Sequence, residues 1–181
     1  MKRLFTLNSI LVLLASLATS QAADKKIVFI AGPPSHGPGD HEHRAGCLLL
    51  SRCVNQVPGI SSVVYSNGWP SDVKAFVGAD AVIIYSDGGD GHPAILPERL
   101  KVLDDLMTKG VGLGCLHYAV EVPTEKGGAE FLKWIGGYFE TFRSVNPTWK
   151  ADFKVLPQHP ITEVSSPNAT RPKRSRASSR C

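Results

Sequence analysis

Short apolar runs, separated by longer segments with a helical repeat, dominate the pattern of this chain. The runs at residues 26–31, 62–65, 81–85 and 111–116 are apolar almost throughout. Such runs are typical of strands that are buried on both faces, as the strands of a parallel sheet are. The pattern therefore predicts a set of parallel strands.

The segments between these runs carry apolar residues at three- and four-residue intervals, which indicates helices. Asp40 and Ser71 are candidate N-caps, and Gly110 is a candidate helix stop. The predicted helices cover residues 40–57, 71–76, 93–109 and 130–139, the last one broken by Gly136 and Gly137. The predicted inner side of the first helix comprises Ala45, Leu48, Leu49, Cys53, Val54 and Val57. Strands that alternate with helices predict an α/β fold, with a doubly wound parallel sheet and helices on both faces. Residues 149–156 alternate and form a further candidate strand.

The two ends of the chain do not fit this pattern. Residues 1–22 run from a basic start through an apolar stretch to small residues at Ala22, which is the order of a secretory signal peptide. We therefore expect a periplasmic or secreted protein. Residues 165–181 lack apolar periodicity and are expected to be a basic, disordered tail. Two interpretations of the tail stay open, a segment that binds an anionic surface and a frameshifted gene end, and we favour the second. The α/β domain is expected within residues 23–164.

The net charge of +4 is misleading, because it comes from the two ends. The predicted signal peptide and tail hold seven of the 20 basic residues and no acidic residue, so the domain has 13 basic and 16 acidic residues. This balance gives no support for a nucleic-acid partner. After removal of the signal peptide, we expect no integral membrane segment.

Histidines gather after the predicted strands. His36, His41 and His43 follow the first strand, His92 follows the third, and His117 ends the fourth. Because the carboxyl ends of parallel strands meet at one edge of the sheet, these side chains should lie close together. Imidazole suits metal binding and proton transfer near neutral pH. We predict His36, His41 and His43 as ligands of a divalent metal ion such as zinc, and His43 also as a catalytic residue.

The loop after the third strand is rich in glycine and holds candidate ligand-binding residues. Glycine lets a polar ligand approach the backbone closely, although a plain turn is an alternative. We predict that Glu121 forms part of the cleft wall. The candidate ligand-binding residues are Asp87, Gly88, Gly89, His92 and Glu121.

Cys115 and His117 stand at the corner after the fourth strand, where many α/β enzymes expose a nucleophile. Both are candidate catalytic residues. We expect only one of the two side chains to point into the cleft. Cys115 is then either a nucleophile or a buried strand residue.

Several segments together resemble the ThuA-like (trehalose utilisation) family. The similarity covers residues 26–162, and its motifs are residues 29–32, 35–46, 85–93, 112–119 and 134–139. The resemblance implies a flavodoxin-like fold related to class I glutamine amidotransferases. It also implies activity on small sugar derivatives, namely 3-keto disaccharides or glycosides, and we expect no nucleotide cofactor. In the family, the corner histidine corresponds to His117 and the loop histidines to His36, His41 and His43.

Two departures from related proteins shape the functional hypotheses. Cys115 is followed by Leu116 and His117, and no His-x-Glu follows, so a glutaminase mechanism is not expected. Family members continue past Thr162 with further strands, so the domain is expected to be incomplete. Three hypotheses stay open: an enzyme acting on sugar derivatives, a non-catalytic carbohydrate-binding protein, and an inactive truncated member of the family. The sequence assigns no oligomeric state.

Overall fold

The computed structural model describes residues 24–140, 143 and 150. The predicted signal peptide, the candidate strand at residues 149–156 and the basic tail lie outside the described residues, with the exception of Lys150. Among the described residues, no helix is both long enough and apolar enough to cross a membrane.

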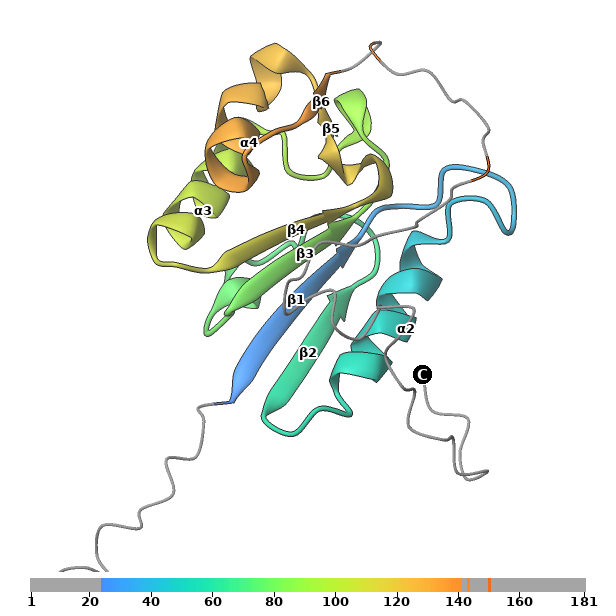
Figure 1. The fold of residues 1–181 in the computed structure, drawn as a ribbon, viewed down its shortest axis with the longest axis vertical. Helices are drawn as coiled ribbons and strands as arrows, with labels where there is room; N and C mark the ends of the chain where they lie inside the picture. Colours follow the sequence, from blue (N-terminus) through green and yellow to red (C-terminus); the bar gives the residue numbers. More distant parts are fainter. Residues whose placement is uncertain (1–23, 141–142, 144–149, 151–181) are drawn as a thin grey trace, which may run out of the picture.

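A parallel four-stranded sheet forms the centre of the described domain (Figure 1). Its strands are β1 (Lys25–Ala31), β2 (Ile60–Tyr65), β3 (Ala81–Tyr85) and β4 (Gly112–Leu116), in the order β2-β1-β3-β4. The central pairing aligns Phe29 with Val64 of β2 and with Ile83 of β3. The predicted α/β fold with a parallel sheet is therefore confirmed, and each apolar run is a strand.

Helices cover both faces of this sheet, because alternate residues of each strand point to opposite sides. On one face, Phe29 and Ala31 pack with Cys47 of α2 (His43–Val54). On the other face, Ile30 and Ile84 pack with Leu103 of α3 (Pro97–Thr108). Figure 1 shows α2 and α3 on opposite sides of the strands. The sheet is thus doubly wound, as the alternation of elements predicts.

A smaller layer follows β4 and packs beside α3. It contains α4 (Gly128–Ile135) and a two-stranded parallel sheet of β5 (Glu121–Val122) and β6 (Phe139–Glu140). Phe131 of α4 is fully buried with Val122 and Ile95. The short 3-10 helices are η1 (Val73–Phe76), η2 (Gly89–Gly91), η3 (His117–Val120) and η4 (Thr124–Lys126).

The prediction for the first helix is wrong in its start and in its inner side. Helix α2 begins at His43 instead of near Asp40, and Leu48 and Leu49 are 43% and 58% exposed. The reason is a contact that local periodicity does not contain. A Cβ atom on Gly46 would lie 2.5 Å from the Tyr85 ring, so the helix approaches the sheet at Gly46 and turns the leucines outward.

Three other helix boundaries also differ from prediction. Helix α3 begins at Pro97, and proline is favourable at the first position of a helix. The residues before it, from Pro93, form a buried turn instead of a helix, and the Pro93 carbonyl accepts a hydrogen bond from the Arg99 side chain. The short helix is a 3-10 turn capped by Asp72, whose side chain accepts the Lys74 N–H, and not by Ser71. Helix α4 begins at Gly128 instead of Glu130. It ends at Ile135, at the predicted break, because Gly136 adopts a left-handed conformation with φ 78°.

The strand order reverses between β1 and β3, which are neighbours in the sheet. From β1 the chain continues through α2 to β2 on one side, and from β3 it continues through α3 to β4 on the other. In open α/β sheets, ligands bind in the crevice at the carboxyl ends of such a strand pair. The residues that follow β1 and β3 are therefore the first place to look for a site.

Candidate functional site

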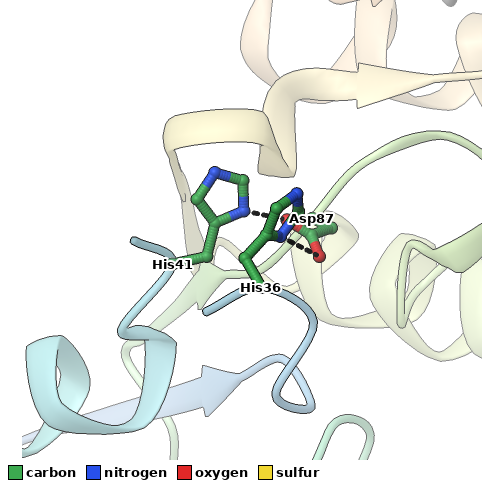
Figure 2. Close-up of side chains that lie close together, drawn as sticks. All are labelled: His36, His41 and Asp87. Carbon is green, nitrogen blue, oxygen red and sulfur yellow. Dashed lines mark hydrogen bonds and ion pairs between the residues drawn. The ribbon is translucent and has the colours of Figure 1, made fainter. Parts of the chain in front are cut away.

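Side chains from two loops and one corner meet at this reversal point. The loop between β1 and α2 supplies the predicted histidines, the segment after β3 supplies Asp87, and the corner after β4 supplies His117. Figure 2 shows His36 and His41 pointing toward the carboxylate of Asp87. The structure thus brings together residues that are far apart in the sequence.

Asp87 is the hub of this cluster. Its Oδ1 accepts a hydrogen bond from His41 Nδ1 at 2.6 Å, and its Oδ2 lies 3.9 Å from His36 Nδ1 (Figure 2). Partial burial acts to raise the pKa of Asp87. The hydrogen bonds from Ser35 and His41, with the charges of His43 and His41, outweigh burial and hold the pKa below its ordinary value. Asp87 is therefore an anion at neutral pH.

His43 lies behind this carboxylate and is almost completely buried, with 1% of its side chain exposed. Its Nδ1 lies 3.2 Å from the carbonyl oxygen of Pro33, so Nδ1 carries the hydrogen of that bond. Its Nε2 lies 3.6 Å from Asp87 Oδ1 and has no hydrogen-bond partner in the described part of the chain. A protonated Nε2 would direct its hydrogen toward this oxygen, whereas the lone pair of a neutral ring would face it, which is unfavourable without an electropositive partner.

Glycine at position 32 lets the chain pass closely between these groups. A Cβ atom there would lie 2.7 Å from Ser86 Cβ and 3.1 Å from His43 Nδ1. A side chain would push β1 away from Ser86 or displace the His43 ring. Gly32 thus helps to set the position of His43 beside Asp87.

His117 completes the cluster from the end of β4. Its Nε2 lies 3.2 Å from His41 Nε2, so His41 bridges Asp87 and His117. His117 is the sole non-glycine residue of the described chain with positive φ, at 59°. Histidine is among the residues that enter this region more readily, yet such a conformation needs support from its surroundings. The corner thus presents the ring to the cluster instead of continuing the strand.

The surroundings of His117 favour its neutral form. Burial and the charges of His41 and His43 lower its pKa below the ordinary value, against the opposing effect of Asp87. A neutral imidazole keeps one lone pair that can accept a proton. The geometry therefore suits His117 to proton transfer.

His36, His41 and Asp87 could hold a metal ion. Each offers one ligand atom, and these atoms all lie within 4.8 Å of one another. Imidazole nitrogen with carboxylate oxygen is a donor set that suits zinc and similar divalent ions. At His41 Nδ1, a metal would replace the proton that now bonds to Asp87. Sequence reasoning named His36, His41 and His43 as metal ligands and gave Asp87 only a ligand-binding role. The group contains Asp87 in place of His43.

Cys115 takes no part in the cluster. It packs toward the opposite face of the sheet, against the hydrophobic clusters that contain Leu103 and Phe131. Burial raises the pKa of its thiol to about 12. A thiol with this pKa is protonated at neutral pH and is a poor nucleophile. The structure favours the alternative of a strand residue that packs against the core, and Cys115 is partly buried there.

His92, Gly88 and Glu121 lie where the β3 loop packs on the corner after β4. His92 is 3% exposed, and its Nε2 donates to the Ala119 carbonyl at 3.0 Å while its Nδ1 accepts the Ala94 N–H. Burial lowers the pKa of His92 to about 4, against the effect of the Ala119 hydrogen bond. A Cβ atom on Gly88 would lie 2.5 Å from Glu121 Cβ.

The contacts of His92 and Gly88 hold the segment that carries Asp87 against the corner that carries His117. Gly89 next to them is buried and begins η2 with φ 59°. These side chains and backbone contacts support the cluster from behind. Their proposed contact with a ligand stays a prediction.

A cavity of about 250 Å³ opens beside the histidines, between the loop after β1 and the start of α2. A groove of about 900 Å³ lies elsewhere, between α3, η4 and α4. Its lysines are paired with its own carboxylates, for example Lys133 with Asp104 at 2.6 Å. The smaller cavity is the one that adjoins the chemically suited side chains. It is lined, among others, by Ser35, His36, His41, Glu42, His43 and Arg44.

Comparison of this chain with protein-family models, curated proteins and solved structures finds no match. The resemblance to the ThuA-like family therefore stays a prediction from the motifs.

Proposed function

We propose that this protein is an exported, metal-assisted enzyme that acts on small sugar derivatives, of the 3-keto disaccharide or glycoside class. The observation that carries the metal is the meeting of His36, His41 and Asp87, whose ligand atoms all lie within 4.8 Å of one another. The substrate class rests on the resemblance to the ThuA-like family.

The residues present fit a zinc-type ion. His36, His41 and Asp87 supply two nitrogens and one oxygen within 4.8 Å of one another. With a neutral His43, a positive charge held there would also offset the approach of the Nε2 lone pair to the Asp87 carboxylate, at 3.6 Å. In this proposal His43 orients Asp87 from behind, as residues next to metal ligands commonly do.

Each group of the cluster has a distinct part in the proposed chemistry. When bound, the ion supplies positive charge that polarises a carbonyl or hydroxyl oxygen of the substrate. His117 accepts or donates the proton, because its neutral ring is exposed at the edge of the cluster. Asp87 holds His41 in place, and His41 in turn contacts His117 Nε2 at 3.2 Å.

Metal content of the full chain tests the first part of the proposal. After removal of bound metal and reloading with Zn²⁺, we expect about one ion per folded chain, measured by elemental mass spectrometry. Asp87→Asn should weaken binding by at least about tenfold, since it removes a charged ligand. Asp90→Asn is the matched control, because Asp90 lies in the same loop but its carboxylate is 78% exposed and pairs with Lys126. Equal zinc binding by both variants, or none by the folded native chain, contradicts the metal site.

Turnover tests the second part. The zinc-loaded protein should consume a 3-keto disaccharide, and His117→Ala should lose this activity while it keeps its zinc. Substrate binding without turnover by the native zinc-loaded chain would refute the enzyme and favour a carbohydrate-binding protein.

A further inference from the structure

Asp87, His41 and His117 are joined by two hydrogen bonds across the cluster. Asp87 Oδ1 bonds to His41 Nδ1 at 2.6 Å (Figure 2), and His41 Nε2 bonds to His117 Nε2 at 3.2 Å. Both nitrogens of the His41 ring are therefore engaged. A neutral imidazole carries one ring hydrogen, so it donates at one nitrogen and accepts at the other. The direction of the first bond thus fixes the direction of the second.

In the metal-free protein, Asp87 fixes these directions. Its carboxylate is an anion at neutral pH and can only accept a hydrogen bond. A neutral His41 must therefore carry its hydrogen on Nδ1, which leaves Nε2 as an acceptor. His117 then donates from Nε2 and keeps a lone pair on Nδ1. Because the His117 residue is exposed, its ring is accessible to a substrate.

The second bond reverses when His41 acts as a metal ligand. Nε2 of this ring faces His117, so Nδ1 is the atom that can join His36 and Asp87 as a ligand. A ring nitrogen that binds a metal carries no hydrogen, so the hydrogen of a neutral His41 then lies on Nε2. The two Nε2 atoms are 3.2 Å apart, which leaves room for one hydrogen between them. His117 must then accept at Nε2 and carry its own hydrogen on Nδ1.

We propose that metal occupancy of the group His36, His41 and Asp87 decides which nitrogen of His117 carries the ring hydrogen. On loading, one proton leaves His41 Nδ1 for water, one passes from His117 Nε2 to His41 Nε2, and His117 Nδ1 takes one from water. The number of protons on the two rings does not change. His41 is thus a positioning residue, which acts on the substrate through His117.

This inference rests on the proposed function and deepens it. The metal-free protein presents a lone pair at His117 Nδ1, whereas the metal-loaded protein presents an N–H there. The loaded enzyme therefore begins its reaction with His117 as a general acid. Occupancy of the site thus regulates whether this ring donates or accepts a proton.

Nitrogen NMR of the full, ¹⁵N-labelled chain tests the proposal, because it distinguishes a ring nitrogen with a hydrogen from one with a lone pair. Spectra are recorded at pH 8, where imidazole is ordinarily neutral, before and after loading with Zn²⁺. His41→Ala and His117→Ala assign the two rings by the loss of their signals. Before loading, we expect the hydrogens on His41 Nδ1 and His117 Nε2. After loading, the hydrogen of His117 should lie on Nδ1.

Two variants test the role of the carboxylate in the metal-free chain. Asp87→Ala removes the acceptor that holds the His41 hydrogen on Nδ1, so this variant should lose that preference. Asp90→Ala is the matched control, because Asp90 pairs with Lys126 and makes no contact with the two rings in the described part of the chain. It should leave the His41 hydrogen on Nδ1.

His92 is the internal control for zinc, since both of its ring nitrogens bond to backbone groups. Zinc should leave its signals unchanged. A chain that binds zinc while His117 keeps its hydrogen on Nε2 would overturn the inference and leave the metal site standing. A His41 hydrogen on Nε2 in the metal-free chain would also overturn it. A folded chain that binds no zinc would remove the metal site and this inference together, so the two failures are distinguishable.

Discussion

Mild acid should destabilise this protein through His92, a histidine that does not belong to the candidate metal cluster. His92 is 3% exposed, and both of its ring nitrogens are engaged in backbone hydrogen bonds, with Ala94 and Ala119. A second proton on the ring would abolish the acceptor at Nδ1. It would also place a charge in an apolar environment, next to the ring of Phe131.

The magnitude follows from the two pKa values of His92. Burial lowers the pKa in the folded protein from 6.5 to about 4, whereas the unfolded chain keeps the ordinary value. Between these values the unfolded chain binds more protons, so the stability that is present above pH 6.5 is lost as the pH falls toward 4. Each pH unit in this interval corresponds to about 1.4 kcal/mol, which gives a loss of roughly 2 kcal/mol between pH 7 and pH 5.

Urea unfolding at pH 7 and pH 5 measures this loss. The free energy of unfolding of the native chain should fall by the full amount between pH 7 and pH 5. The His92→Gln side chain keeps a donor and an acceptor but does not titrate, so the fall in this variant should be smaller by about 2 kcal/mol. His36→Gln is the control, because that side chain is 51% exposed. As a check without substitution, the His92 ring should keep its neutral chemical shifts down to pH 5. Parallel pH profiles of the native chain and His92→Gln, or a ring that titrates near pH 6.5, would refute the reasoning.

Two further predictions concern packing and thiol reactivity. Gly88→Ala should lower the free energy of unfolding by about 1–3 kcal/mol in urea unfolding, because its Cβ atom would lie 2.6 Å from the Tyr118 carbonyl oxygen. A Cβ atom on Gly91 would meet nothing within 4 Å, so Gly91→Ala should leave the free energy of unfolding nearly unchanged. Equal losses of stability in the two variants would contradict this account of the packing. Cys47 and Cys115 should resist iodoacetamide at pH 8 in the folded chain, as burial raises the pKa of their thiols to about 11 and about 12. Peptide mapping by mass spectrometry reads out the labelling, and rapid modification of Cys115 before unfolding would contradict its buried placement.

The strands and their layering were predictable from the sequence because their signal is local. Each run, such as that of β1, is apolar on both faces, and this pattern is typical of a strand covered by helices on both sides. The face of α2 was not predictable in the same way. Four apolar residues from Cys47 to Leu50 are consistent with more than one inner side, and the packing of Tyr85 on Gly46 decides between them.

The candidate site was predictable in its position but not in its detailed contacts. The rule for parallel sheets placed the histidines and Asp87 at one edge, and His36, His41, His43 and His117 do lie near it. His92 follows a strand as the others do, yet it is packed in the interior. A signal was present, because the apolar residues Pro93, Ala94 and Ile95 follow His92, whereas glycine, proline and polar residues surround the loop histidines. The central role of Asp87 depends on long-range contacts that no local pattern contains.

The position of β1 has a consequence for the order in which the chain can fold. Although β1 comes first in the sequence of the domain, it lies between β2 and β3, and β3 begins only at Ala81. Until the chain as far as Tyr85 is available, β1 lacks one of its two neighbours. Contacts between such distant segments slow folding, because loops must close before the contacts form. The histidine loop after β1 therefore becomes part of a site late, when β3 and then His117 arrive beside it.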